Sequence, residues 1–149
     1  MAGRLGEPGG GGLIEPAASL YERAGGTPFF EGLVERFYAG VAEDPLIRPL
    51  YPEADLGPAQ HRLTLFLIQY WGGPTTYDQE RGHPRLRMRH MPFKLDQRAR
   101  DRWVQLMDRA LDEAKLPKES EDLLRGFFHH MATFLMNAPT AGSLPIAGQ

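Results

Sequence analysis

Prolines and glycines divide the chain into short segments, and this spacing limits the folds it can adopt. Nine prolines and nine glycines fall between Ser19 and Ala138. A proline inside a helix removes a hydrogen bond and clashes with the preceding turn, while glycine commonly ends helices. Between these residues, apolar side chains recur at offsets of three and four, which is the signature of one helix face. The sequence therefore predicts an all-α domain with four substantial helices and several short ones.

Capping residues or Pro and Gly pairs bound each expected helix. The expected segments are 20–24, 28–43, 55–71, 84–90, 96–116 and 120–138. Their first or capping residues are Ser19, Thr27, Asp55, Pro84, Asp96 and Ser120. The 55–71 helix should be the most buried, because Leu65 and Ile68 widen its apolar side. Polar residues 75–82 predict a loop.

Composition excludes several classes of protein. The chain has 17 basic and 19 acidic residues, a net charge of -2, so the basic excess of a dedicated nucleic-acid binder is missing. The absence of cysteine excludes disulfides, thiolate metal sites and a cysteine nucleophile, and it suits a reducing cytoplasm. No apolar run reaches the roughly 18 residues of a membrane span. We therefore expect a cytoplasmic protein without an integral membrane span.

The two ends differ from the middle of the chain. Residues 1–18 are rich in Gly and Pro, and residues 139–149 carry no charge. Neither segment has enough apolar residues to bury a core. We expect a disordered tail at 1–18, one domain at 19–138, and a flexible C-terminal tail at 139–149.

His90 stands out by its neighbours. It ends an arginine-rich stretch, and Met88, Met91 and Phe93 could place soft apolar groups around its imidazole. A neutral nitrogen ligand, an apolar slot and nearby guanidinium groups suit haem. The alternative is a partly exposed histidine at the end of a basic helix, and this stretch alone leaves both interpretations open.

The region from Arg81 to Arg102 carries eight basic and two acidic residues. This charge could bind phosphate or RNA, but no aromatic side chains are interleaved with the arginines as stacking platforms. A solvated helix face is the simpler interpretation, and we expect no nucleic-acid partner.

Three polar aromatic residues, Tyr38, Tyr51 and Trp103, fall at positions expected to face inward. Each alone would suit a core, but three hydrogen-bond donors in one apolar pocket would suit a binding site. The chain has no phosphate loop, GxSxG, HExxH or paired-cysteine motif, so a hydrolytic centre is not predicted.

Several motifs, taken in order, resemble the group II truncated haemoglobins of the actinobacterial type. The resemblance covers about residues 19–138 and rests on Phe37-Tyr38, Tyr51-Pro52-Glu53, the segments 69–74 and 82–90, and Trp103. It implies a two-over-two helical sandwich around haem b (iron protoporphyrin IX), with His90 as the proximal iron ligand.

The resemblance also implies roles for other residues. Tyr38, Tyr51 and Trp103 become the distal polar residues that act on the ligand. Ala59 takes the place where many globins have a distal histidine, and Leu63 covers the haem one turn later. The remaining expected haem contacts are Phe66, Phe93 and Met107 against the porphyrin, with Arg62, Arg87, His83 and Tyr77 toward the propionates.

Such a pocket is expected to bind dioxygen tightly, with nitric oxide and carbon monoxide as further ligands. Slow release suits redox chemistry, such as nitric oxide dioxygenation or peroxide reactions, better than oxygen delivery. That chemistry requires an external reductase, because the sequence contains no flavin or nicotinamide site. The alternatives are a haem-based sensor or carrier without turnover, and a haem-free helical regulatory domain. The family also suggests a homo-oligomer.

Overall fold

The computed structural model describes residues 18–138, and within that range it contains helices and no strand, which confirms the all-α prediction. The expected tails at 1–18 and 139–149 lie outside the described residues, apart from Ala18. The elements are α1 (Leu20–Ala24), α2 (Thr27–Ala42), the 3₁₀ helix η1 (Arg48–Leu50), α3 (Gly57–Tyr70), α4 (Thr76–Arg81), α5 (Leu86–His90), α6 (Gln97–Asp112) and α7 (Lys118–Phe134). None of the helices described has the length and apolar character needed to cross a membrane.

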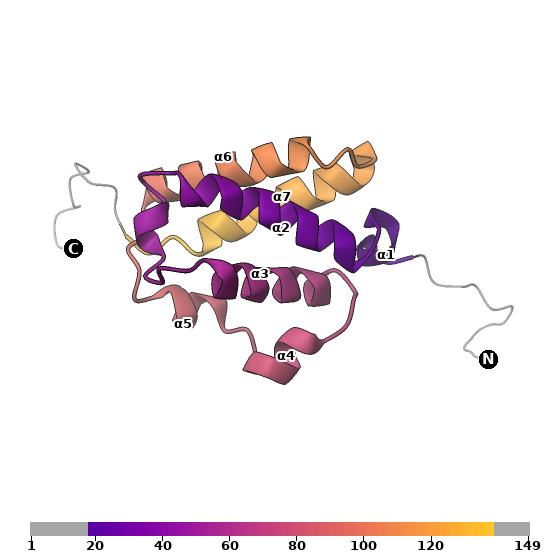
Figure 1. Cartoon of the computed structure of the whole chain (residues 1–149), viewed down its shortest axis with the longest axis horizontal. Coiled ribbons are helices and arrows are strands. Elements are labelled where there is room, and N and C mark those ends of the chain that lie inside the picture. The colour runs from indigo at the N-terminus through magenta and orange to yellow at the C-terminus, as the bar shows by residue number, and fades with distance from the viewer. Residues whose placement is uncertain (1–17, 139–149) are drawn as a thin grey trace, which may run out of the picture.

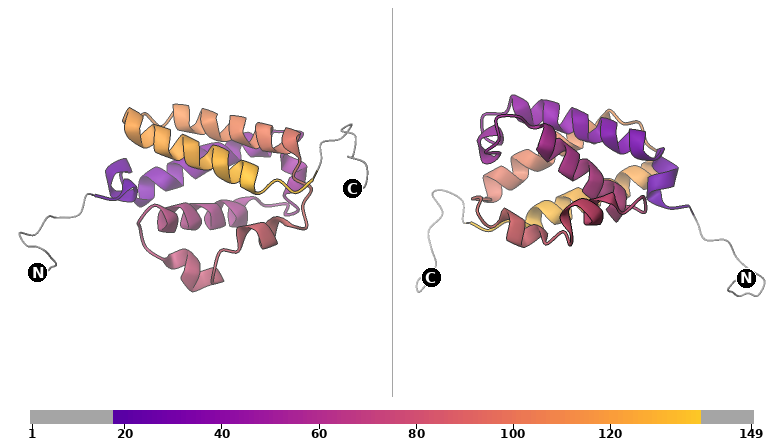
Figure 2. Two further views of the ribbon diagram at one scale, coloured as in Figure 1. Left: turned by 180° about the vertical axis from the view of Figure 1, so that it is seen from behind. Right: turned by 60° about the horizontal axis from the view of Figure 1, so that its bottom comes forward.

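The four long helices form two packed pairs. Helix α2 packs on α3 and on α6, and α6 packs on α7 (Figure 1). The short helices α4 and α5 lie beneath α3, on the side away from α6, as Figure 1 and the left view of Figure 2 show. Helix α2 contributes more residues to the hydrophobic core cluster than any other helix, and its Phe30, Leu33, Val34 and Phe37 are fully buried.

Two predicted N-caps and one glycine C-cap are present as expected. Ser19 forms a capping box with Glu22, and Gly25 ends α1 with a left-handed φ of 115°. The Asp96 carboxylate begins α6 by accepting a hydrogen bond from the Ala99 amide at 2.9 Å. These caps depend only on local sequence, which explains why they could be predicted.

Four helix starts differ from prediction, and one of them is α5, which begins at Leu86 rather than Pro84. Gly26 rather than Thr27 is the N-cap of α2, because the Thr27 hydroxyl instead hydrogen-bonds the Tyr21 hydroxyl at 2.7 Å. Helix α3 begins at Gly57, whose amide donates to the Asp55 carboxylate at 2.8 Å. Helix α7 begins at Lys118, directly after Pro117 and two residues before Ser120.

The loop predicted at 75–82 is wrong, because residues 76–81 form α4. Gln69 of α3 holds this segment: its side-chain oxygen accepts from the Asp78 amide, and its side-chain nitrogen donates to the Asp78 carboxylate, both at 3.0 Å. Tyr77 is buried with 3% exposure. These contacts come from outside residues 75–82, so the pattern within that segment could not reveal them.

The expectation that the helix after Asp55 is the most buried is also wrong. Leu65 and Phe66 of α3 are only half-buried, while six residues of α2 are buried. The reason is that Leu63 and Phe66 face a cavity rather than protein.

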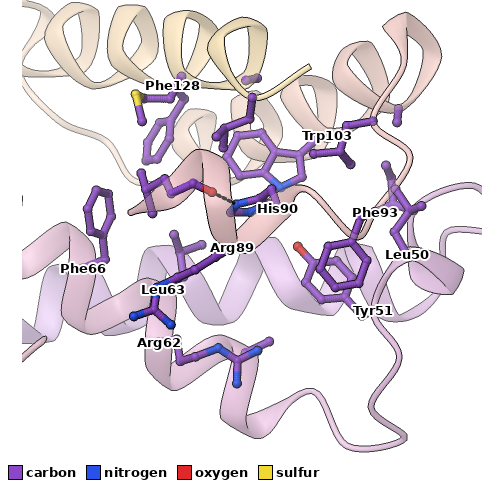
Figure 3. A pocket seen from close by; sticks show the side chains of 18 of the residues that line it. Leu50, Tyr51, Arg62, Leu63, Phe66, Arg89, His90, Phe93, Trp103 and Phe128 are labelled. Carbon is purple, nitrogen blue, oxygen red and sulfur yellow. Dashed lines mark hydrogen bonds between the residues drawn. The ribbon is translucent and has the colours of Figure 1, made fainter. Parts of the chain in front are cut away.

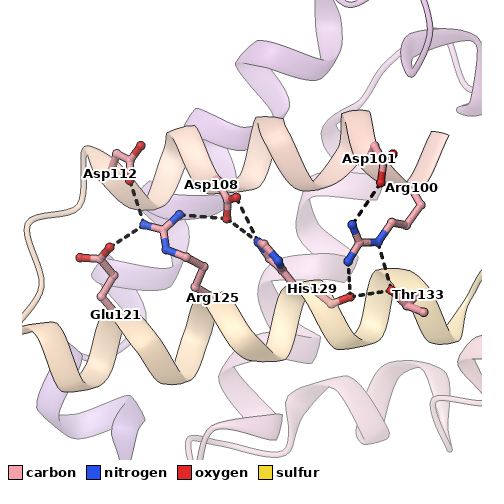
Figure 4. Close-up of polar contacts among 8 residues, drawn as sticks. All are labelled: Arg100, Asp101, Asp108, Asp112, Glu121, Arg125, His129 and Thr133. Carbon is pink, nitrogen blue, oxygen red and sulfur yellow. Dashed lines mark hydrogen bonds and ion pairs between the residues drawn. The ribbon is translucent and has the colours of Figure 1, made fainter. Parts of the chain in front are cut away.

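A polar network on the outer surface joins α6 to α7 (Figure 4). Arg125 of α7 pairs with Asp108 and Asp112 of α6, and with Glu121 of its own helix. The pKa of Arg125 is raised, first by its hydrogen bond with Glu121 and also by the two aspartates. His129 reaches the Asp108 carboxylate at 3.0 Å, so Asp108 joins two residues of α7.

The turn after α3 brings the chain close to α1. The Tyr21 amide donates to the Trp71 carbonyl at 3.0 Å. A Cβ atom on Gly73 would lie 2.7 Å from Ile68 Cγ2 and from Tyr21 Cε1, so only glycine fits there. The neighbouring Gly72 has a φ of 106°, and a Cβ atom there would lie 2.7 Å from Ser19 Cβ, so both residues of the Gly72-Gly73 pair need to be glycine.

Candidate functional site

A cavity of about 490 Å³ lies between α3, α5, α6 and α7, with Tyr38 of α2 and the loop after η1 at one side. Its walls are mainly apolar. The predicted site residues that line it are Tyr38, Tyr51, Ala59, Arg62, Leu63, Phe66, Tyr77, His90, Phe93 and Trp103. Segments far apart in the sequence thus meet at one space, whose size is in the range of small-molecule and cofactor sites.

His90, the last residue of α5, faces this cavity. Its Nδ1 lies 2.7 Å from the Leu86 carbonyl oxygen, one turn earlier (Figure 3). A carbonyl oxygen can only accept, so Nδ1 carries a proton, and in the neutral imidazole the lone pair therefore lies on Nε2. The backbone therefore fixes the tautomer that a metal ligand needs.

The segment after His90 is fixed to the end of α7. Asn137 donates from its side-chain nitrogen to the His90 carbonyl at 3.2 Å, and its side-chain oxygen accepts from the Leu95 amide at 2.9 Å. The Asn137 amide donates in turn to the Leu95 carbonyl at 2.9 Å. These bonds limit how far α5 can shift relative to α7.

Tyr38, Tyr51 and Trp103 form a polar group on another side of the cavity. The Tyr38 hydroxyl donates to the Tyr51 hydroxyl oxygen at 3.4 Å, which leaves the Tyr51 proton free for another acceptor. Burial raises the pKa of both tyrosines, so both remain protonated donors at neutral pH. The Trp103 ring packs against Phe37 and Phe128, with ring centroids 4.9 and 6.0 Å away.

Arg48 of η1 holds the loop that carries Tyr51. Its guanidinium donates to the carbonyl oxygens of Tyr51 at 3.0 Å, Glu53 at 2.8 Å and Ala54 at 3.0 Å. One planar cation bound to three carbonyls leaves this loop little freedom.

Asp44 connects the start of the same corner to α6. Its carboxylate is nearly buried and accepts from the amides of Leu46 and Ile47 at 3.1 and 2.9 Å, and from Arg102 Nε at 2.6 Å. Arg102 directly precedes Trp103, so the Asp44–Arg102 contact links the corner that leads to Tyr51 with the helix that carries Trp103. Burial raises the pKa of Asp44, but the three hydrogen bonds outweigh it and hold that pKa below its usual value.

Cationic groups lie at one edge of the cavity. Figure 3 shows Arg62 and Arg89 on the side of the pocket away from Phe128. Arg62 pairs with Glu53 at 3.0 Å, and this contact lowers the pKa of Glu53. Arg89 donates to the carbonyl oxygens of Pro84 at 2.6 Å and of Arg81 at 3.0 Å, and so braces the turn before α5.

Three expected site residues do not line the cavity. Met107 is fully buried in the core, one turn beyond Trp103 on α6. His83 is exposed. The Arg87 guanidinium lies over the Phe134 ring, 5.1 Å from its centre, and is exposed.

The sequence did not single out several other lining residues, and two groups of them bear on the site. Arg81 and Arg89 lie in the basic stretch already noted, but only their position in the fold shows that they reach the cavity. The second group shares one side of α7 and its end: Phe127, Phe128, Met131, Ala132 and Leu135. Apolar spacing along a helix is the same whether that side of the helix packs against other side chains or lines a cavity, so it could not identify these residues.

The residues around the cavity fit a haem. His90 offers a lone pair on Nε2, and within residues 18–138 no hydrogen bond occupies that atom. The walls are apolar, as a porphyrin requires, and Arg62, Arg81 and Arg89 can face two carboxylates. An all-α chain with this pocket belongs to the class of haem-binding globins.

Comparisons with known proteins agree with this class. The model of the bacterial-like globin family matches residues 19–137. A group 2 truncated hemoglobin of Bacillus subtilis is 37% identical over 116 residues, 78% of this chain and 87% of the relative.

Solved structures agree as well. A thermostable hemoglobin from the actinobacterium Thermobifida fusca is 50% identical, with a TM-score of 0.81, over 83% of this chain and 100% of the other. A truncated oxygen-avid haemoglobin from Bacillus subtilis is 37% identical, with a TM-score of 0.76, over 80% of this chain and 100% of the other.

The chain belongs to the bacterial-like globin family and, within it, to the group II truncated haemoglobins. The family supports haem-based binding of dioxygen and other small diatomic ligands, and its two-on-two fold is the one expected from the sequence.

Proposed function

We propose that this globin holds haem b, binds dioxygen tightly and uses it in redox chemistry such as nitric oxide dioxygenation, with peroxide reactions as a second use. One observation carries the proposal: Tyr51 and Trp103 line the same cavity as His90, and the Tyr51 hydroxyl proton is left free by the Tyr38 contact. The oxygen-avid haemoglobin of Bacillus subtilis, a relative of similar fold, supports the tight-binding part.

His90 would hold the haem iron through Nε2, with its other nitrogen fixed on the Leu86 carbonyl. Arg62, Arg81 and Arg89 would face the propionates, and Leu63, Phe66 and Phe93 would contact the porphyrin. Haem, when bound, supplies an iron atom that binds dioxygen and exchanges single electrons.

The chain's own donors would set the affinity. A hydrogen bond to an acceptor that carries charge contributes about 1.5–3 kcal/mol. Two such donors, Tyr51 and Trp103, would slow dioxygen release by roughly 10² to 10⁴, because about 1.4 kcal/mol is tenfold. Carbon monoxide is a weaker acceptor and would gain less. Slow release makes a poor oxygen carrier and favours consumption of the bound ligand.

Access to the cavity is also set by side-chain size. Ala59 is buried on the α3 side, where a larger residue would narrow the path. Small diatomic ligands would pass it without displacing a large side chain. On the inner side, the Trp103 indole would block a path toward Phe128.

Turnover would require an external reductase, and the absence of cysteine suits a cytoplasmic location. We also propose that copies of this chain associate into a homo-oligomer, because the family suggests it. The second candidate function is a sensor or carrier without turnover, for which the same tight pocket would serve.

Nitrate yield separates the two functions. The haem-loaded protein is given dioxygen, nitric oxide and a chemical reductant, and nitrate is measured per haem. Many nitrates per haem support dioxygenation, whereas one nitrate or fewer supports the sensor or carrier. The Trp103→Phe variant should lower the yield at limiting dioxygen.

A further inference from the structure

Exposed apolar and basic side chains gather around α5, the short helix that carries His90. Met88 and Met91 are 57% and 67% exposed, and Phe134 at the end of α7 is 44% exposed. Only two other large apolar residues in the described part of the chain are exposed, Tyr70 and Leu123. Large apolar side chains on a surface commonly mark an interaction site.

Basic residues surround this apolar centre. Arg85, Arg87 and Lys94 are exposed, and none pairs with a carboxylate within residues 18–138. The Arg87 guanidinium lies 5.1 Å from the Phe134 ring centre, which joins α5 to the end of α7 in one surface. We call this surface the proximal patch, and its residues are Arg85, Arg87, Met88, Met91, Lys94 and Phe134.

The charge of the patch contrasts with that of the whole chain. Residues 81–98 hold six basic residues and one acidic residue, in a chain of net charge -2. The one acidic residue, Asp96, is buried as the cap of α6 and does not oppose the exposed cations. Positive charge is therefore concentrated around α5, and a negatively charged partner would be steered to this helix.

We propose that the proximal patch is the docking surface for an acidic one-electron donor protein, such as a reduced flavodoxin. This inference rests on the redox function proposed above. Met and Arg are enriched in protein interfaces, and a small apolar centre with a charged rim suits brief, weak electron-transfer contacts. Met91 adjoins His90 in the chain, so a docked donor would sit on the element that holds the iron ligand. The donor loses one electron, the haem gains it, and no bond is made or broken.

The structure disfavours other occupants. A second copy of the chain in a two-fold symmetric dimer would place the same positive surface against itself, and like charges repel. Helix α5 has five residues, too few for an amphipathic helix that lies in a membrane surface. A nucleic-acid base would need a free aromatic face, but Arg87 covers Phe134.

Charge reversal tests the patch, and the chain offers a matched control. The test variant is Arg85→Asp with Lys94→Glu. The control variant is Lys115→Asp with Arg109→Glu, at exposed residues beyond the patch. Arg85 and Lys115 both have left-handed backbones, with φ of 47° and 57°, and Asp tolerates that conformation. The two variants therefore carry the same change in charge and a similar backbone constraint.

The readout is the dissociation constant of the haem-loaded protein with a purified acidic flavodoxin, measured by calorimetry at low and high salt. We expect wild type to bind more weakly as salt rises, the test variant to lose about tenfold or more at low salt, and the control to stay within about threefold. Met88→Gln with Met91→Gln should weaken binding at both salt concentrations, because it removes the apolar centre without changing charge.

Equal dissociation constants for the test and control variants would overturn the proposal, as would binding that does not depend on salt. The proposal would also be overturned if the patch bound anionic phosphatidylglycerol vesicles or single-stranded DNA but did not bind flavodoxin. The proposed function fails separately, because nitrate yield with a chemical reductant needs no docked protein. Loss of that yield in wild type would reject the function, whereas the dissociation constants alone decide the docking surface.

Discussion

Replacing Tyr51 by phenylalanine should speed dioxygen release more than replacing Tyr38 does. Both hydroxyls lie near the cavity, but Tyr38 donates to Tyr51 at 3.4 Å, while the Tyr51 proton remains free. Tyr51→Phe removes a direct donor, worth about 1.5–3 kcal/mol, so release should accelerate about 10- to 150-fold. Tyr38→Phe removes only a long, weak contact to Tyr51, and we expect less than about a fivefold effect.

The assay is stopped-flow measurement of dioxygen dissociation in the single and double variants. If Tyr38 acts through Tyr51, the double variant should match Tyr51→Phe within about twofold. Carbon monoxide release serves as the control and should change less. An effect of Tyr38→Phe equal to or larger than that of Tyr51→Phe would show that Tyr38, and not Tyr51, is the direct donor.

Three further predictions concern residues that support the site. Asp44→Asn should cost about 1–3 kcal/mol of unfolding free energy at pH 7, measured by urea denaturation, because Arg102 loses a charged partner. Folding lowers the pKa of Asp44, so its contribution to stability is present above the ordinary pKa of about 4 and is lost as the pH falls through the lower folded value. If the loss of unfolding free energy in Asp44→Asn stayed constant down to about pH 2, this pH dependence would be contradicted. Arg48→Met should speed dioxygen release about threefold to tenfold in wild type and have no effect in Tyr51→Phe, and an equal effect in both backgrounds would exclude a role through Tyr51. Gly73→Ala should cost about 1–3 kcal/mol by the same denaturation assay, because its Cβ would overlap Ile68, and an unchanged stability would show that the turn can move.

Local chemistry explains which features could be predicted from the sequence. Ser19 and Asp96 cap helices through bonds to residues three positions away, so the sequence alone contains the information. Helix α4 could not be found in this way, because Gln69 and the burial of Tyr77 hold it from outside the segment.

In the site, too, the residues that could not be predicted are those whose role depends on where the fold places them. Trp103 and Met107 share one side of α6, and the sequence gives no reason to separate them, yet only Trp103 lines the cavity. The cavity lies against the first half of α6, while Met107 packs in the core beyond it. The sequence likewise does not show which of Arg87 and Arg89, two arginines of the same basic stretch, reaches the cavity. Their positions on a five-residue helix place Arg87 over Phe134 and Arg89 at the cavity.

An absorption spectrum tests whether His90 holds a haem in this cavity. The purified full-length protein, loaded with haem, should show a strong Soret band that shifts on reduction and again on exposure to dioxygen. His90→Ala should lose the band at equal haem and protein concentration, whereas His61→Ala, an exposed histidine paired with Glu80, should keep it. Full retention of the wild-type spectrum in His90→Ala, or no Soret band in the wild type, would contradict the account.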